Sequence, residues 1–149
     1  PTLTKHAFPV IRDRTRYLTR LLAPTSRSSR RMDKITGRSD DMLIIRGVNV
    51  FPSQIEEQIL RDKRLAGTYQ IILNRDGHLD NIEVCCEVTR ELSFGLSDAD
   101  RSNISKELQH RIKTNVGVST RVNVMLFETL PRTEVGKARR VFDHRPKQN

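Results

Sequence analysis

Tryptophan is absent from this chain of 149 residues, and aromatic residues together make up only 5% of it. There are two cysteines, Cys85 and Cys86, and they are adjacent. Neighbouring residues on a strand point to opposite faces, so this pair can form neither a disulfide framework nor a four-ligand metal site. We therefore predict no metal site and interpret both cysteines as small apolar residues of a strand.

Long hydrophobic runs are also missing. No stretch of about 18 apolar residues is present, and the first residues do not combine a basic segment with an apolar one, so the sequence predicts neither a membrane span nor a signal peptide. Hydrophobic residues make up 36% of the chain and charged residues 30%, which is typical of a globular domain with a core. The expected location is the cytoplasm.

The net charge of +9 is concentrated at the two ends. Residues 1–40 hold 10 Lys and Arg against 3 acids, residues 41–130 hold 11 against 13, and residues 131–149 hold 6 against 2. A nucleic-acid-binding domain would spread basic residues over its folded core, so this distribution argues against one. The basic ends either line a site for polyanionic small molecules or are simply solvated.

Two segments near the start resemble a stub and a linker. Residues 10–22 partly alternate apolar and polar side chains and are expected to be extended. Residues 23–31, with the sequence APTSRSSRR, have the Pro, Ser and Arg content of a loop. We expect a domain boundary nearby, between a first part at 1–37 and a second at 38–149.

Periodicity predicts six elements after the linker. Ser53 to Glu56 resembles a capping box that opens a helix after Pro52, and a second capping box begins at Ser97, with Gly117 as the helix stop. Ile104, Leu108 and Ile112 recur at helical spacing on the second helix. The predicted strands are 42–45, 69–73, 82–88 and 121–127, with the Asp-Gly turn signal at 76–77 between the second and third.

The resulting order, β-α-β-β-α-β, predicts an α+β fold with a split sheet and two helices on one face. Many functions share this fold, so the fold alone does not decide the function. RNA-recognition domains of this type expose aromatics on the first and third strands, where this sequence has none; Tyr69 lies on the second.

Two glycine-bearing segments flank the sheet pattern. The first, at residues 37–52, reads GRSDDMLIIRGVNVFP, and the second, at residues 130–141, reads LPRTEVGKARRV. The first resembles the segment that joins the two domains of adenylate-forming ligases, and its wording is close to that of bacterial phenylacetate-CoA ligases. The second resembles the P-x-T-x-x-G-K loop of the same superfamily. Two such motifs in the right order are far more specific than a lone Gly-Lys pair.

The resemblance covers essentially the whole chain and implies an acid-thiol ligase. Such an enzyme couples phenylacetate, or a related aryl acid, to ATP as an acyl-adenylate with release of pyrophosphate, and then transfers the acyl group to CoA with release of AMP. The chain would be the mobile carboxyl-terminal domain, preceded by the end of a large amino-terminal domain. It lacks that family's phosphate loop and most of its acid-binding pocket, so we expect this polypeptide alone to be inactive.

The resemblance also implies roles for individual residues. Lys137 matches the catalytic lysine of the first step, and Gly136 supports its loop. Asp40 matches the hinge about which the domain rotates, and Arg38 matches an arginine that reaches the nucleotide. Gly47 matches a glycine beside which the pantetheine arm of CoA passes. Without the resemblance, a solvated turn at Lys137, a turn at Asp40, a surface charge at Arg38 and a strand-end kink at Gly47 would be the ordinary interpretations.

The substrates and partners follow from the same resemblance. ATP and CoA are expected as substrates, with Mg²⁺ accompanying ATP and bound mainly outside this chain. The partner of the domain would be the large amino-terminal domain, a homodimer is possible, and neither nucleic acid nor a membrane is expected to bind.

Two other functions stay open from the residues alone. A free-standing regulatory module of the split-sheet type would dimerise with concentration and hold a metabolite. A basic nucleic-acid-binding domain would lose affinity steeply with salt.

One departure from the family pattern yields a first prediction. Members carry Y-R-T-x-D before the linker, with the aspartate on the ribose hydroxyls, whereas this sequence has Asp13 first and Tyr17 last. A phenol lacks the bidentate acceptor that a carboxylate offers to a diol. We expect Tyr17→Asp in the full-length ligase to lower the KM for ATP in a steady-state assay, and an unchanged KM would contradict this hypothesis.

Overall fold

The structure is a computed structural model that describes residues 14–25, 29–77, 79–132 and 139–146. The chain divides into two compact units, Pro1–Met42 and Leu43–Asn149. Each unit is described by itself.

The first unit contains short antiparallel strand pairs in its described part. The strands are β1 (Tyr17–Leu18), β2 (Leu21–Leu22), β3 (Arg31–Met32) and β4 (Gly37–Arg38). Strand β1 pairs with β4 and β2 pairs with β3, which gives a ladder of two-residue strands. The extended stub expected from the sequence is thus present where residues 14–22 are described.

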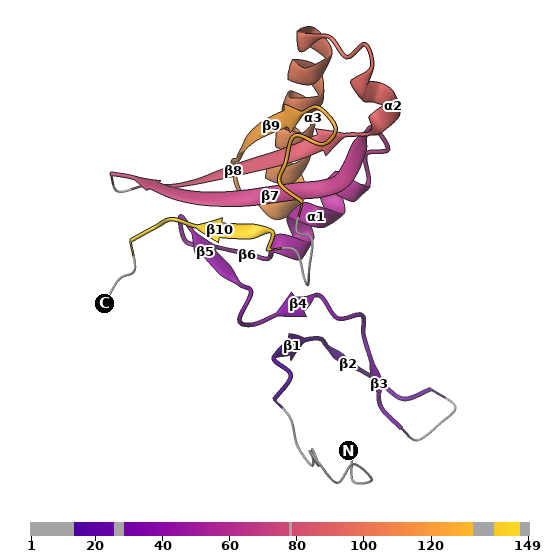
Figure 1. Ribbon diagram of the computed structural model, residues 1–149. Coiled ribbons are helices and arrows are strands. Elements are labelled where there is room, and N and C mark those ends of the chain that lie inside the picture. The colour runs from indigo at the N-terminus through magenta and orange to yellow at the C-terminus, as the bar shows by residue number, and fades with distance from the viewer. Residues whose placement is uncertain (1–13, 26–28, 78, 133–138, 147–149) are drawn as a thin grey trace, which may run out of the picture. The chain divides into compact units, whose positions relative to one another are not determined.

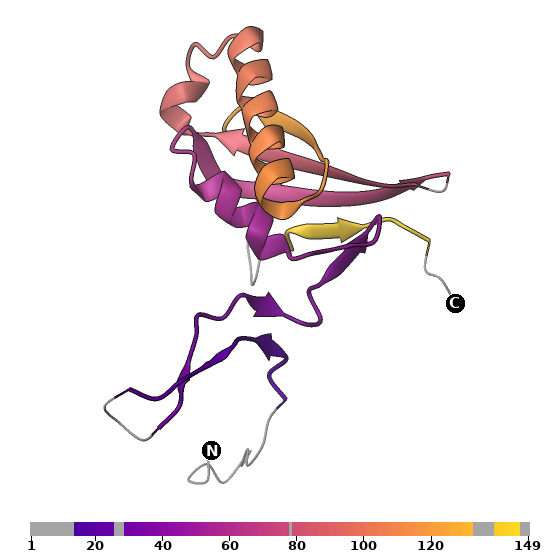
Figure 2. The ribbon, with the colours of Figure 1, turned by 180° about the vertical axis from the view of Figure 1, so that it is seen from behind.

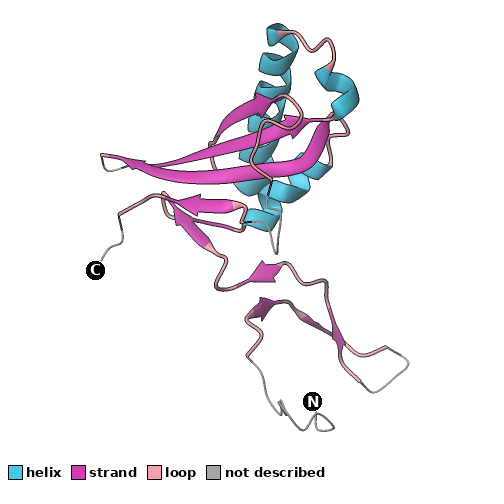
Figure 3. Ribbon diagram, viewed as in Figure 1, coloured by secondary structure: helices cyan, strands magenta, loops and turns pink. Residues whose placement is uncertain are grey.

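The second unit combines a mixed sheet with helices, as Figures 1 and 3 show. Its elements are β5 (Leu43–Ile45), β6 (Val48–Val50), α1 (Pro52–Leu60), β7 (Leu65–Asp76), β8 (Leu79–Val88), α2 (Arg90–Ser93), α3 (Asp98–Val116), β9 (Arg121–Met125) and β10 (Val141–Asp143). The predicted α+β class is therefore confirmed. No helix in the described part of the chain is long and apolar enough to cross a membrane.

The main sheet has the strand order β10-β7-β8-β9. Strands β7 and β8 form a long antiparallel hairpin, while β9 runs parallel to β8 and β10 runs parallel to β7. The predicted strands at 69–73 and 82–88 are confirmed, and both extend further toward their turn at Gly77 than the sequence indicated.

Helices α1 and α3 pack on one face of this sheet, and Figure 2 shows them in front of it. Strand residues two apart share a face, so Ile82, Val84, Cys86 and Val88 all enter the core beneath the helices. The core also takes the buried faces of β7, the hairpin β5–β6 and both helices. Its other members include Ile45, Val50, Ile55, Ile59, Ile71, Leu73, Ile104, Leu108, Ile112, Val122 and Val124.

Helix α3 begins and ends as predicted. Ser97 is its N-cap, with Oγ accepting a hydrogen bond of 3.1 Å from the Asp100 N–H and donating one of 2.6 Å to the Asp100 carboxylate. At the other end Gly117 has φ 82°, and its N–H donates to the Lys113 carbonyl. Glycine occupies this left-handed conformation without a Cβ clash.

Helix α1 begins differently from the prediction. Its N-cap is Phe51 rather than Ser53, and Pro52 is the first helical residue. The Phe51 N–H donates to Gln54 Oε1 at 3.0 Å, which is the reciprocal half of a capping box. Phe51 has no side-chain acceptor, so the predicted hydroxyl cap is wrong while the predicted helix is confirmed.

The first predicted strand does not join the main sheet. Leu43–Ile45 instead pairs with Val48–Val50 in a hairpin whose two central residues are Arg46, at φ 50°, and Gly47, at φ 79°. Positive φ at both positions defines a type I′ turn, which reverses the chain at once. The free edge of β7 is taken by Val141–Asp143, a strand that the sequence did not predict.

This change makes β7 a central strand, which bears on the RNA-binding interpretation. Tyr69, set aside above because it lies on the second strand, is now on a central one. The residue is only 4% exposed, however, so its ring cannot serve as a stacking platform for a base.

Strand β9 and the cysteines complete the comparison. Val122 and Val124 are buried as expected, but Leu126 lies beyond the end of β9 and is 42% exposed, so its predicted place in the strand is wrong. Cys85 and Cys86 are buried on β8, which confirms their interpretation as strand residues. Burial raises the pKa of the Cys86 thiol to about 12.

A buried carboxylate fixes the end of α1 to α3. Asp62 has a side chain that is 5% exposed and accepts hydrogen bonds from Arg64 Nη2 at 2.8 Å and from Arg111 Nη2 at 2.6 Å. The hydrogen bond from Arg64 lowers the pKa of this carboxyl by more than burial raises it, so the pKa lies far below its usual range. Arg64 also reaches the exposed Glu107 of α3.

The Asp62 cluster predicts a pH-dependent stability. A depressed pKa stabilises the fold above the unfolded pKa of about 3.9, and this contribution is lost as the pH falls through the folded pKa. We expect Asp62→Asn to lower the free energy of unfolding by roughly 1–3 kcal/mol at pH 7, and the gap to wild type to close in acid. Urea unfolding at several pH values checks this. As a control, Glu107→Gln should cost less than about 1 kcal/mol.

The cap of α3 gives a second stability prediction. Replacing Gly117 by Ala forces an L residue into the left-handed region, which should cost roughly 1–2 kcal/mol. Gly67→Ala is the matched control, because its Cβ would meet Leu60 Cδ2 at an ordinary 3.8 Å and no positive φ is involved. Equal denaturation midpoints for the two variants would contradict the left-handed conformation of Gly117.

Candidate functional site

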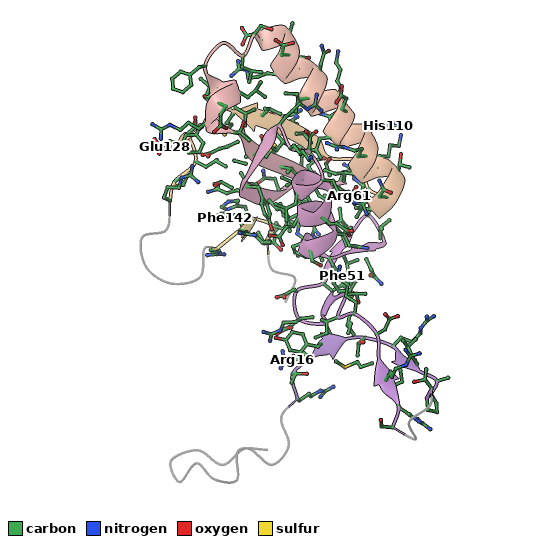
Figure 4. The ribbon with its side chains drawn as sticks, turned by 90° about the vertical axis from the view of Figure 1, so that its right-hand side faces the viewer. Arg16, Phe51, Arg61, His110, Glu128 and Phe142 are labelled. Atoms are coloured by element: carbon green, nitrogen blue, oxygen red, sulfur yellow. The ribbon has the colours of Figure 1, made fainter. Side chains whose placement is uncertain are left out.

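The face of the sheet opposite the helices is crossed by the segment that follows β9. Figure 1 shows this segment, residues 126–132, passing in front of β8 and β7 before the chain reaches β10. In the side view of Figure 4 the labelled Glu128 and Phe142 lie on one side of the sheet, and His110 of α3 lies on the other. The second glycine-bearing motif therefore begins on the helix-free face.

Glu87 anchors the beginning of this motif. It follows Cys86 on β8, so its side chain points away from the helices, and it is fully buried. Its Oε1 accepts from the Leu130 N–H at 2.7 Å, and its Oε2 accepts from Arg132 Nη2 at 2.6 Å. A buried carboxylate is tolerated when it is paired and hydrogen-bonded in this way.

Arg132 also contacts β7 and the segment that follows β9. Its Nη1 donates to Thr68 Oγ1 of β7, and its guanidinium lies 5.4 Å from the centroid of the Phe127 ring. The residues just before position 133 are therefore held to both long strands.

Arg140 anchors the chain immediately before β10. Its carbonyl accepts from the Ile71 N–H at 2.7 Å, and its guanidinium pairs with Glu56 of α1. The guanidinium also donates to the Tyr69 hydroxyl at 3.2 Å and lies 4.7 Å from that ring's centroid. Burial, more than any other influence, raises the pKa of Tyr69, so this hydroxyl stays protonated at neutral pH.

A pocket of about 480 Å³ lies beside these two anchors. Arg132, Arg139 and Arg140 supply its positive charge, and Thr68 and Phe142 are among its other lining residues. Two of the three cations are already paired with carboxylates, while Arg139 contacts the Phe142 ring and the Val141 carbonyl. The site thus gathers cationic groups beside residues 67–70 of β7, which suits a polyanionic partner.

Lys137 and Gly136 lie outside the described residues. They belong to 133–138, and what the structure gives is the anchoring of the two ends of that segment, at Pro131–Arg132 and Arg139–Arg140.

Arg38 and Asp40 lie together in the first unit. Asp40 accepts from Arg38 Nε at 3.0 Å and from Arg38 Nη2 at 2.7 Å, and Arg16 Nη1 lies 3.6 Å from the same carboxylate. The bond from Arg38 lowers the pKa of Asp40, and reciprocally raises the pKa of Arg38. Tyr17 pairs with Arg38 across β1 and β4, with the guanidinium 5.8 Å from its ring centroid.

Gly47 occupies the turn of the hairpin β5–β6. Its φ of 79° favours glycine, and a Cβ built there would meet nothing within 4 Å, so the backbone faces open space. The neighbouring Arg46 holds this turn to β8 by donating to the Asp80 carbonyl at 2.8 Å and to Asn81 Oδ1 at 2.9 Å.

Sequence reasoning missed Glu87 and the Arg140 cluster. A signal for Glu87 was present, because it is the one charged residue between Val84 and Val88 in an otherwise apolar run. The pairing of Glu56 with Arg140 joins residues 84 positions apart, and no local pattern announces such a contact.

The family model that describes the carboxyl-terminal domain of AMP-binding enzymes matches residues 47–145. Among curated proteins, the chain is 54% identical over 147 residues to a phenylacetate-coenzyme A ligase of Aromatoleum evansii, covering 99% of this chain and 33% of the relative. It is 56% identical over 144 residues to the Escherichia coli K12 protein of the same name, covering 97% and 32%. The chain spans about a third of the length of the curated relatives it matches.

Solved structures of similar fold include enzymes of the same class. A domain of a phenylacetate-coenzyme A ligase from Bacteroides vulgatus matches with a TM-score of 0.64 and 31% identity, covering 73% of this chain and 97% of that one. A 2-hydroxyisobutyryl-CoA ligase in complex with 2-HIB-AMP and CoA matches with a TM-score of 0.64 and 32% identity, covering 74% of this chain and 23% of that one.

Proposed function

We propose that this chain, which belongs to the family of AMP-binding enzyme C-terminal domains, is the mobile domain of an ATP-dependent phenylacetate-CoA ligase. The observation that carries the proposal is its identity of more than half to ligases of that name over almost the whole chain. Phenylacetate comes from those relatives' names, because the acid-binding pocket is expected outside this chain.

The proposed reaction has two steps. The acid's carboxylate attacks the α-phosphate of ATP, which forms the acyl-adenylate and releases pyrophosphate. The CoA thiol then attacks the acyl carbon, loses its proton, and displaces AMP to leave the thioester. Between the steps the domain rotates, so that different residues of this chain face one active site.

We assign Lys137 to the first step. An ammonium placed between the attacking carboxylate and the phosphate offsets the repulsion between two negative groups. Gly136 lets the loop backbone approach closely, since it carries no side chain. The anchoring of both ends of the 133–138 segment supports this assignment, because a catalytic loop needs fixed ends to deliver a side chain to one position.

We assign Asp40 to the hinge and Arg38 to the nucleotide. Asp40 lies just before the division between the two compact units, at Met42 and Leu43. A backbone rotation there would change the orientation of one unit relative to the other. Arg38 uses Nε and Nη2 to hold Asp40, so a nucleotide would engage the remaining N–H donors, on Nη1 and Nη2, or compete for the two in use. We keep the proposed boundary between residues 37 and 38 as the start of the mobile domain.

We assign Gly47 to the second step. The open space at its Cα allows the thin pantetheine arm of CoA to pass close to the hairpin backbone. The large amino-terminal domain would supply the acid pocket and phosphate loop, and we propose that the assembled ligase works in the cytoplasm, which supplies ATP and CoA. A homodimer remains part of the proposal.

Mg²⁺ would accompany the ATP phosphates and neutralise part of their charge. No group of three or more His, Cys, Asp or Glu that could hold a metal ion occurs among the described residues. These residues do not fit a metal site, so we derive no step through the ion.

Lys137→Ala in the full-length ligase tests the proposal. We expect pyrophosphate-ATP exchange with phenylacetate to fall about 100- to 1,000-fold, because the transition-state charge loses its stabilising cation. Thioester formation from synthetic phenylacetyl-adenylate and CoA should remain within about twofold of wild type, since the lysine has left the site by then.

Lys106→Ala is the matched control, because this exposed lysine lies on α3, which packs on the sheet face opposite the one that residues 126–132 cross. It should leave both steps unchanged. Unchanged exchange in Lys137→Ala would overturn the assignment of the catalytic lysine.

A further inference from the structure

The strongest unassigned feature is the fully buried carboxylate of Glu87 on the helix-free face of the sheet. The neighbouring Cys85 on that face is neutral, and Glu83, four residues earlier, is only half-buried. Burying a charge costs folding free energy even when it is paired, and an apolar residue at this place would pack at lower cost. A buried ion pair of this kind is therefore weak evidence for a purely stabilising role.

The contacts of Glu87 are concentrated on one short piece of chain. One oxygen takes the Leu130 N–H at 2.7 Å and the other takes Arg132 Nη2 at 2.6 Å, so the carboxylate spans Pro131 between them. Pro131 has a fixed φ and no N–H to lose. Leu130 is itself buried, at 6% exposure. Residues 130–132 thus leave the sheet in one direction only.

That direction matters because position 133 follows immediately. The opposite end is fixed independently, through Arg140 to Glu56, Tyr69 and Ile71. The two ends differ in one respect: among the described residues, Glu87 alone holds both Leu130 and Arg132 at the first end, with Thr68 as a further partner of Arg132. The second end is shared among a carboxylate, a hydroxyl and the strand ladder. Loss of Glu87 should therefore loosen the first end, at Leu130 and Arg132, and leave the second end in place.

We propose that Glu87 is a positioning residue for adenylate formation, which acts by fixing Leu130 and Arg132 at the root of the segment that carries Lys137. It touches neither ATP nor the acid. This inference rests on the proposed function, since it assumes that Lys137 serves the first step. A displacement of the lysine by about 1 Å is enough to lower a rate by about 100-fold.

The test uses the full-length ligase that carries this domain, or the E. coli relative with this chain in place of the matching segment. Glu87→Gln keeps an acceptor for the Leu130 N–H and removes the charge that holds Arg132. We expect kcat for pyrophosphate-ATP exchange to fall roughly 10- to 100-fold with the KM for ATP changed by less than about twofold, and thioester formation from synthetic adenylate to stay within about twofold of wild type.

Glu83→Gln is the matched control. It makes the same change of charge on the same strand and the same face, and among the described residues Glu83 accepts a hydrogen bond from Asn123 of β9 rather than from residues 130–132. Both half-reactions should be unchanged in this variant.

A second variant covers the case in which Glu87→Gln folds poorly. Arg132→Gln alters the exposed partner, whose side chain is 43% exposed, and should give the same selective loss of the first step. In the double variant the loss should equal that of either single change, because residues that act as one unit are not additive.

The outcomes separate this inference from the function on which it rests. A parallel fall of both half-reactions, or no fall in either, overturns the positioning role of Glu87. If Lys137→Ala loses the first step selectively while the Glu87 and Arg132 variants do not, the proposed function stands and the inference fails. If Lys137→Ala loses neither step, the proposed function itself fails.

Discussion

The antiparallel pairing of β7 with β8 is the constraint on which the rest of the second unit depends. Ten to twelve residues per strand give a ladder long enough to carry β9 and β10 on its two edges. Alternation along the ladder then creates two chemically different faces. One face is apolar and is covered by α1 and α3; the other contains Glu83, Cys85 and Glu87 and is covered partly by chain that returns from β9.

Two buried carboxylates, Asp62 and Glu87, connect different parts of this unit. Asp62 joins the end of α1 to α3 through Arg64 and Arg111, so it couples elements of the scaffold. Glu87 joins the scaffold to a connecting segment through a backbone N–H and one arginine. The contacts of Asp62 resist relative motion of α1 and α3. The contacts of Glu87 instead hold residues 130–132, which lead to the segment with Lys137. This difference in partners, rather than in burial, leads us to connect only Glu87 with the chemistry.

Local patterns predicted the elements well where a single periodicity or cap dominates. Helix α3 followed from its apolar spacing and its Ser97 and Gly117 caps, and β8 followed from its alternation. Patterns failed where the outcome depends on a partner. The Arg46-Gly47 turn pairs the first predicted strand with β6 in a local hairpin, and β10 occupies the edge of β7 instead. The same holds at the candidate site. The two motifs could be located from the sequence, but Glu87 and Glu56, which hold the ends of the second motif, could not.

The sequence by itself determined the α+β class, the helices α1 and α3, the long hairpin and the two motifs that identify the family, because each depends on residues within a short stretch of chain. The short helix α2 was not predicted. Tertiary structure decided which strands share a sheet, why Glu87 and Glu56 are opposite Arg132 and Arg140, and which face the second motif crosses. The physical reason is that an ion pair between residues 45 or 84 positions apart forms only after the sheet has brought them together. No local preference of either residue encodes that contact.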